Sequence, residues 1–263
     1  MTCHAPTLTT PQWQLFIDLE GRSGAENMAV DQALLDEAAQ SGTETLRLYR
    51  WNPPCLSFGR NEAAGLHYDR ARIEQLGIDV VRRPTGGRAV WHEHEITYAV
   101  AAPIETFGSL REAYLTIHER LAAALRALGA DASLAPDHLT AQPPNRPGSC
   151  FTLPVGGEIL VRGRKLVGSA QVRQRGALLQ HGSILLGGSQ EMIRGVSLQT
   201  SDVRSATNLS AVLGRPVAFV EVAKAVVNAF ADRLTAALPG RPTAAAPDRL
   251  TAAFLDSSWT WRR

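Results

Sequence analysis

A cysteine and a lysine in the second half of the chain could carry covalent chemistry. Cys150 follows Gly148 and Ser149 at the end of a proline-rich segment, and such loops commonly present active-site groups. Lys165 opens an expected strand within a segment rich in arginine. A fixed ammonium beside a thiol lowers the thiol pKa, because the thiolate gains a counter-charge. An inert loop cysteine and an exposed edge-strand lysine are the plainer alternatives, which composition alone favours.

The segment 82–88, Arg-Arg-Pro-Thr-Gly-Gly-Arg, is a candidate ligand-binding loop. Its Gly86-Gly87 pair lets backbone N–H groups approach a ligand closely, and the flanking arginines suit a phosphate or a carboxylate. The segment is not a P-loop, because no Gly-Lys-Ser/Thr follows and no helix is expected to begin there. A strand-to-strand turn with solvated arginines explains the pattern equally well.

Small residues recur within two expected strands further along the chain. These strands contain Gly168-Ser169-Ala170-Gln171 and Gln180-His181-Gly182-Ser183. Small side chains weaken strand packing but leave room for a ligand that lies against the backbone. His181 could be a satisfied interior histidine, a general base or a positioning donor.

The other cysteines and the histidines of segment 92–95 are weaker candidates for catalytic or metal-binding residues. The segment 92–95, His-Glu-His-Glu, lacks helical H-E-x-x-H spacing and a further ligand cluster, so we favour a polar turn and reject zinc. Cys3 lies in the N-terminal tail. Cys55 lies in an apolar strand, where a cysteine is most often a core residue.

The elements that must position these residues follow from periodicity, caps and turn residues. Helices are expected over 26–41, 109–128 and 219–234, with a short one within 250–261. Strands are expected over 45–51, 55–58, 78–81, 89–91, 96–102, 158–161, 165–170 and 177–186, with 55–58 as a possible partner of 45–51. Arg-Gly turns join the last three strands, and a long loop covers 135–149. This mixed order predicts a single α/β domain of the α+β type over 1–263, with its core at about 26–245 and a loose tail at 1–12.

Composition excludes several classes of protein. The 263 residues are 44% hydrophobic and 20% charged, which is typical of a globular domain, and the net charge of +2 is too small for a dedicated nucleic-acid binder. No apolar run is long enough to span a membrane, and residues 1–13 do not resemble a signal peptide. Three cysteines without a CxxC pair indicate free thiols in a reducing compartment, so we expect a cytoplasmic protein.

The motifs together resemble the lipoate–protein ligase and biotin ligase superfamily. Segment 82–92 is similar to its arginine-glycine loop, and segments 163–171 and 179–186 are similar to its lysine strand and the neighbouring strand. The resemblance covers about 26–235. It implies a biotin/lipoate protein ligase-like catalytic domain, in which a bent mixed β-sheet flanked by helices holds an acyl chain in an apolar tunnel.

The Cys150-Phe151 pair places the resemblance with the cysteine-dependent octanoyltransferases. These enzymes move octanoyl from acyl carrier protein to a lysine of a lipoyl-domain protein such as the glycine cleavage system H protein. The resemblance implies that Cys150 is the acylated nucleophile and that Lys165 lowers its pKa. It implies no cofactor, no metal, no nucleic acid and no membrane partner, and we expect a monomer. The implied substrate-binding residues are Arg83, Gly86, Gly87, Arg88, Ala89, Gly168, Ser169, Ala170, His181 and Gly182.

Three other functions remain open. An ATP-dependent lipoate–protein ligase would activate a free acid on the Gly86-Gly87 loop, although the Thr85 and Arg88 variants of that loop slightly favour a transferase. An octanoyl amidotransferase would move octanoyl from H protein to dehydrogenase E2 subunits, also through a cysteine. A non-enzymatic carrier-docking module is the most distant alternative, because the chain keeps both Cys150 and Lys165.

Overall fold

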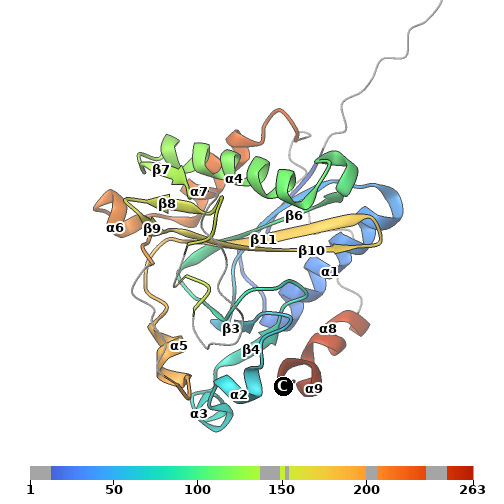
Figure 1. The fold of residues 1–263 in the computed structure, drawn as a ribbon, viewed down its shortest axis with the longest axis vertical. Coiled ribbons are helices and arrows are strands. Elements are labelled where there is room, and N and C mark those ends of the chain that lie inside the picture. Colours follow the sequence, from blue (N-terminus) through green and yellow to red (C-terminus); the bar gives the residue numbers. More distant parts are fainter. Residues whose placement is uncertain (1–12, 137–148, 152–153, 200–205, 235–247, 263) are drawn as a thin grey trace, which may run out of the picture.

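A five-stranded mixed sheet forms the centre of the computed structural model, which describes residues 13–136, 149–151, 154–199, 206–234 and 248–262 (Figure 1). Its strand order is β1-β2-β6-β11-β10, with β1 parallel to β2 and every other pair antiparallel. The strands are β1 (Gln14–Ile17), β2 (Thr45–Tyr49), β6 (Glu95–Pro103), β11 (Ala177–Leu185) and β10 (Val167–Gln174). The expected tail at 1–12 and most of the loop at 135–149 lie outside the described residues.

Two three-stranded sheets accompany the central sheet. One has the order β4-β3-β5 and the other β7-β8-β9. Their strands are β3 (Cys55–Phe58), β4 (Asp79–Arg82), β5 (Val90–His92), β7 (Ala132–Leu134), β8 (Ile159–Val161) and β9 (Arg164–Lys165). The prediction that 55–58 pairs with the preceding strand was wrong. Both edges of β2 are already occupied, by β1 and β6, so β3 pairs with β4 and β5 instead.

Helices cover both faces of the central sheet. The long ones are α1 (Gly24–Ser41), α4 (Leu110–Ala127) and α7 (Phe219–Ala229). The shorter ones are α2 (Ala64–His67), α3 (Arg70–Gln75), η1 (Ile104–Thr106), α5 (Glu191–Val196), α6 (Leu209–Leu213), α8 (Asp248–Leu255) and α9 (Ser257–Thr260). The chain leaves the helical conformation after Ala229, earlier than the predicted helix 219–234, and Leu234 then forms an isolated bridge with Trp13, next to the start of β1.

Local sequence determines where the long helices begin and end. Ser23 and Glu26 form a capping box at the start of α1, and Gly42 ends the helix in the left-handed conformation. Ser109 caps α4 by accepting a hydrogen bond from the Glu112 backbone N–H. The helices predicted over 26–41 and 109–128 are therefore confirmed to within two residues.

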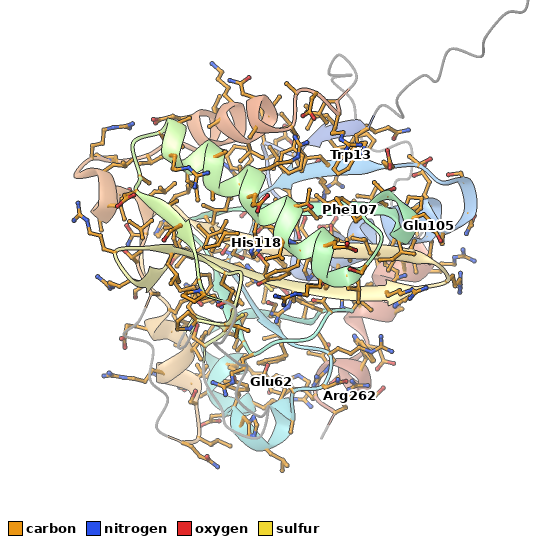
Figure 2. All side chains as sticks on the ribbon, turned by 45° about the horizontal axis from the view of Figure 1, so that its top comes forward. Trp13, Glu62, Glu105, Phe107, His118 and Arg262 are labelled. Atoms are coloured by element: carbon orange, nitrogen blue, oxygen red, sulfur yellow. The ribbon has the colours of Figure 1, made fainter. Side chains whose placement is uncertain are left out.

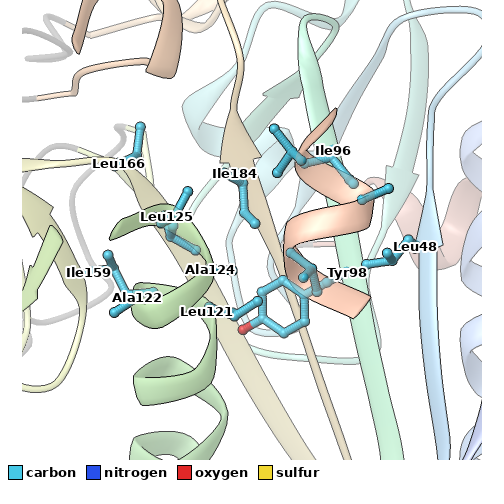
Figure 3. Close-up of a cluster of buried hydrophobic side chains, with 14 of the residues drawn as sticks. Leu48, Ile96, Tyr98, Leu121, Ala122, Ala124, Leu125, Ile159, Leu166 and Ile184 are labelled. Atoms are coloured by element: carbon cyan, nitrogen blue, oxygen red, sulfur yellow. The ribbon is translucent and has the colours of Figure 1, made fainter. Parts of the chain in front are cut away.

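Alternation along β6 builds two cores, one on each face of the sheet. Ile96, Tyr98 and Val100 belong to the cluster under α4 and α7, part of which Figure 3 shows. Ala99 and Ala101 belong to the cluster under α1. Successive strand residues point to opposite faces, so one strand contributes to both cores.

The Arg-Gly turns predicted between the last strands are confirmed. Arg175 and Gly176 have φ values of 49° and 83° and connect β10 to β11 directly, because Gln174 pairs with Ala177. Positive φ at both central residues is typical of a type I′ hairpin turn. The predicted strand 165–170 divides into β9 and a longer β10, which continues to this turn.

Cys55 provides a test of the packing between α1 and β3. Its side chain is fully buried, as predicted for a core cysteine, and its sulfur lies so close to Gly24 that a Cβ added there would be 2.6 Å away. We expect Cys55→Ala to lower the free energy of unfolding by about 1 kcal/mol, because it removes a small buried hydrophobe. Urea denaturation at constant m-value measures the effect, and an unchanged midpoint would contradict it.

Candidate active site

The segment that carries Cys150 is attached to the protein at several points. Ser149 forms a bridge with Ala89, and the Cys150 N–H donates to the Ala89 carbonyl at 2.9 Å. The Phe151 side chain is fully buried, and a Cβ on Gly168 would lie 2.9 Å from its ring. Glycine is therefore required at 168 by close packing. The half-buried Cys150 thiol is held in place even though the described residues 149–151 belong to no helix or strand.

Lys165 reaches Cys150 from β9, whose second residue it is, just after the Arg162-Gly163 turn. Its Nζ donates to the Cys150 carbonyl at 2.6 Å and lies 3.9 Å from the Cys150 sulfur. The side chain is 1% exposed, so the alternative of a solvated edge lysine is wrong. The predicted proximity of ammonium and thiol is confirmed.

Glu158 is the partner of Lys165 that the sequence analysis missed. One carboxylate oxygen accepts from Lys165 Nζ at 2.6 Å, and the other accepts from the Val155 N–H at 2.8 Å. Burial raises the pKa of Glu158, and the Lys165 charge offsets only part of this effect. Because Glu158 is a counter-ion, the ammonium is less free to stabilise a Cys150 thiolate than an isolated charge would be. The sequence signal that could have identified Glu158 is its acidic side chain at the start of an expected strand, within a segment rich in arginine.

The candidate ligand-binding loop 82–88, called the glycine loop from here on, lies beside Cys150. A Cβ on Gly87 would be 3.8 Å from the Cys150 sulfur, and one on Gly59 would be 1.8 Å from the Gly87 carbonyl oxygen. Arg83 is buried and donates to the Arg88 carbonyl at 2.8 Å and to the Ser57 carbonyl at 3.0 Å. Its guanidinium therefore shapes the loop from within.

Arg82 also points inward, so the alternative of solvated arginines is wrong for both residues. Its guanidinium donates to the carbonyls of Gly59 and Glu62, and to those of Trp259 and Thr260 at the C-terminal helices. Burial lowers the pKa of Arg82 to about 10. Arg82 thus connects the start of the glycine loop to α9.

Two cavities meet at Cys150. The outer cleft has a volume of about 590 Å³, and the inner cavity holds only about 20 Å³, which is room for one water molecule. Arg88, Arg111 and Tyr114 line the outer cleft, while Met28 and Trp51 line the inner cavity. Three residues line both and define what we call the neck: Cys150, Ser169 and Ala170.

His181 holds the glycine loop to α1. Its Nδ1 lies 2.8 Å from Asp31 Oδ2, and its Nε2 lies 2.6 Å from Thr85 Oγ1. Burial acts to raise the pKa of Asp31, but the hydrogen bond to His181 and the charge of Arg47 lower it below its usual value. Both ring nitrogens have partners, which agrees with the positioning alternative for His181. On the same strand, a Cβ on Gly182 would be 2.4 Å from Ser169 Oγ.

The interpretation of 92–95 as a polar turn was wrong for its two ends. His92 and Glu95 are buried, with Nδ1 and Oε1 2.8 Å apart, and His92 Nε2 lies 2.5 Å from Ser57 Oγ. Burial lowers the pKa of His92, with Glu95 opposing the shift. Only Glu93 and His94 are exposed. Within the described residues, no cluster of three His, Cys, Asp or Glu side chains could hold a metal ion, and no helix is long and apolar enough to cross a membrane.

His118 is a further residue that the sequence analysis missed. It projects from α4, is fully buried, and lies 2.8 Å from Ser169 Oγ through Nε2 and 2.7 Å from the Gly157 carbonyl through Nδ1 (Figure 2). Tyr114, one turn earlier, packs on its ring with centroids 4.1 Å apart. A histidine on the apolar stripe of the predicted helix was the signal that could have identified it.

Comparison with known proteins places these motifs in one family. The model of the lipoyl protein ligase A/B catalytic domain matches residues 23–231. Octanoyltransferase LipM of Kyrpidia tusciae is 41% identical over 247 residues, which cover 87% of this chain and 89% of the relative. Octanoyltransferase LipM of Moorella thermoacetica is 37% identical over 218 residues, which cover 78% and 80%.

Solved structures of low sequence identity share the fold. Lipoate-protein ligase A bound with ATP has a TM-score of 0.76 at 22% identity, covering 95% of this chain and 98% of the ligase. A putative lipoate protein ligase from T. acidophilum with bound lipoic acid has a TM-score of 0.74 at 21% identity, covering 95% and 98%. These similarities confirm the predicted ligase-like catalytic fold.

The buried His118 predicts a pH-dependent stability. Burial lowers its pKa from 6.5 to about 4, so between these values the unfolded chain binds a proton that the native protein does not. The free energy of unfolding should therefore fall as the pH decreases from 6.5 to 4, by about 3 kcal/mol for this residue. His118→Gln should remove that part of the slope, measured by urea unfolding at several pH values. His94→Gln, at an exposed side chain, should keep it, and equal slopes in the two variants would contradict the assignment.

Proposed function

The chain belongs to the family of lipoyl protein ligase A/B catalytic domains, and we propose that it is an octanoyltransferase that carries the acyl group as a thioester on Cys150. The observation that carries this proposal is the position of Cys150 at the neck, with the Lys165 ammonium 3.9 Å from its sulfur. The donor is octanoyl on acyl carrier protein, and the acceptor is a lysine of a lipoyl-domain protein such as glycine cleavage H protein. A cytoplasmic location and a monomeric state remain predictions.

In the first half-reaction, the Cys150 thiolate attacks the donor thioester. A C–S bond to Cys150 forms, the C–S bond to the carrier thiol breaks, and the carrier leaves as a thiol after taking up a proton. A thioester replaces a thioester, so the exchange needs no ATP. Splitting the transfer in this way is nucleophilic catalysis with ping-pong kinetics.

The inner cavity is the proposed site of the octanoyl chain. Met28, Tyr49, Trp51 and Val90 supply apolar contacts. Several polar groups in its wall are paired within the protein, as the Thr97 hydroxyl is with the Trp51 indole N–H at 2.7 Å. The present volume of the cavity admits one water molecule, so the octanoyl chain must widen the cavity when it binds. The flexible Met28 side chain is suited to move aside.

The outer cleft is the proposed entrance for both carrier proteins. Arg88 and Arg111 line it, and exposed arginines on the neighbouring strands add positive charge, among them Arg164 and Arg173. Positive potential at an entrance steers acidic partners and increases their association rate. The same cleft would serve an amidotransferase, whose octanoyl donor is a lipoyl-domain protein.

An octanoyl adduct on Cys150 is the direct test of the covalent step. Incubation with octanoyl-acyl carrier protein in the absence of ATP should add one octanoyl group to the wild type, detected by intact-protein mass spectrometry and peptide mapping. Cys150→Ala should form no adduct and lose transfer while remaining folded, and Cys55→Ala should retain both. Transfer that requires free octanoate and ATP, with no adduct from octanoyl-acyl carrier protein, would indicate the ligase alternative, and transfer by Cys150→Ala would refute the thioester. Donors and acceptors tested one at a time distinguish the amidotransferase.

Lys165 and Glu158 should affect the reactivity of Cys150 in opposite directions. Lys165→Met removes the ammonium and should slow iodoacetamide alkylation of Cys150 about tenfold at pH 7.5. It should reduce transfer by about a further 10²-fold if Nζ also stabilises the oxyanion. Glu158→Gln keeps a hydrogen-bond acceptor but removes the counter-ion, so alkylation should become faster.

The alkylation comparison has a clear failing outcome. If both variants change the alkylation rate in the same direction, Lys165 does not act on the thiol through its charge. Lys165→Arg should restore the charge but not the position of the donor, and should be partly active.

A further inference from the structure

Ser169 supplies the polar side chain at the neck beside the nucleophile. Of the three residues that line both cavities, Cys150 carries the thiol and Ala170 has an apolar side chain. Ser169 is half-buried. Its side chain lies on the α4 face of β10, with Tyr98 and His118. The outer cleft reaches this face, because Tyr114 of α4 lines it together with Ser169 and Cys150. The acceptor lysine enters through this cleft, so the direction of the Ser169 proton decides what the hydroxyl can bind there.

His118 fixes the direction of the Ser169 proton. A carbonyl only accepts, so the 2.7 Å contact with the Gly157 oxygen places a hydrogen on His118 Nδ1. Burial lowers the pKa of His118 to about 4, so the ring is neutral at pH 7 and Nε2 is an acceptor. Ser169 Oγ lies 2.8 Å from Nε2 and donates its one proton there.

Tyr98 occupies one of the two acceptor positions of Ser169. Gln180 Nε2 donates to the Tyr98 hydroxyl at 2.9 Å, and that hydroxyl lies 2.7 Å from Ser169 Oγ. Since the Ser169 proton points to His118, Tyr98 is the donor in this contact. A hydroxyl has one donor and two acceptor positions. Among the described residues, the second acceptor position of Ser169 has no partner, so this lone pair is available to a group in the outer cleft.

We infer that this lone pair accepts an N–H of the acceptor lysine, and that His118 is the positioning residue that keeps it available. The inference rests on the proposed function. In the second half-reaction, the amine nitrogen bonds to the carbonyl carbon and the C–S bond to Cys150 breaks. The nitrogen loses one proton and the Cys150 sulfur gains one, so that thioester and amine become amide and thiol. A hydrogen bond from the other N–H to Ser169 would direct the nitrogen lone pair at the carbonyl.

The same geometry makes Ser169 unsuitable for the first half-reaction. The departing carrier thiolate needs a proton donor, and the Ser169 proton is directed away from the neck to His118. Ser169 also contributes little to the fold, because the Tyr98 hydroxyl lies 3.3 Å from His118 Nε2 and can donate there when Ser169 is absent. A loss confined to the second half-reaction is therefore the signature of the proposed role.

Single-turnover experiments on Ser169→Ala separate the two half-reactions. Cys150 is first loaded from S-octanoyl-N-acetylcysteamine, and an isolated lipoyl domain is then added, with both steps followed by intact-protein mass spectrometry. We expect loading within about twofold of wild type and discharge slowed about tenfold, which corresponds to about 1.4 kcal/mol and to one hydrogen bond. Ser169→Thr keeps the hydroxyl and should discharge within about threefold of wild type. Ser133→Ala, at an exposed serine on β7, is the matched control and should change neither step.

Any other result of these experiments would overturn either the role of Ser169 or the thioester proposal. Normal discharge by Ser169→Ala, or an equal loss in both steps, would overturn the role of Ser169 and leave the thioester proposal standing. Unfolding of Ser169→Ala would also overturn it, because the hydroxyl would then be a structural requirement. Absence of loading in the wild type would refute the thioester proposal instead.

Discussion

A buried ammonium organises this site. Lys165 is 1% exposed, and an unpaired charge at such a depth is strongly destabilising, so the chain must supply partners for it. Glu158 and the Cys150 carbonyl are those partners, each 2.6 Å from Nζ. The carbonyl contact fixes residues 149–151, which as described belong to no strand or helix. The position of the nucleophile is thus partly a consequence of satisfying a buried cation, and removing either charged partner leaves the other uncompensated, at a cost of about 3–5 kcal/mol.

A second buried ionic group prepares the acyl side of the neck. Arg47 is fully buried and donates to Asp31 Oδ1 at 2.8 Å, while the other oxygen of Asp31 lies 2.8 Å from His181. His181 then reaches Thr85 in the glycine loop. Because each group in this series has its partner within the protein, the inner cavity can be lined by polar residues and still offer few open hydrogen-bonding positions to an acyl chain. The absence of a side chain at Gly182 lets β10 approach closely enough to complete that wall.

Sequence reasoning succeeded where the determinant is local. The helices 26–41 and 109–128 and the Arg175-Gly176 turn depend on neighbouring residues, and each was predicted from them, although the Ser23 cap that starts α1 two residues earlier was not. The pairing of β3 failed because it depends on which sheet edges are free after the whole chain has folded. Cys150 and Lys165 were found by residue type, and the resemblance supplied their roles. Glu158, the partner of Lys165, and His118, the partner of Ser169, were not found. A buried carboxylate and a buried imidazole look like ordinary polar residues until packing removes them from water.

The two cavities also explain why a covalent intermediate suits this protein. Under the proposed function, the octanoyl chain fills the inner cavity, so both the carrier thiol and the acceptor lysine must reach the carbonyl carbon from the outer cleft. Cys150 and Ser169 lie where the two spaces meet in the described part of the chain, and two carrier proteins cannot present their arms there together. A thioester on Cys150 holds the acyl group while one carrier leaves and the other arrives. The neck thereby determines the order of events: the donor thiol must leave before the amine can occupy the position beside Ser169.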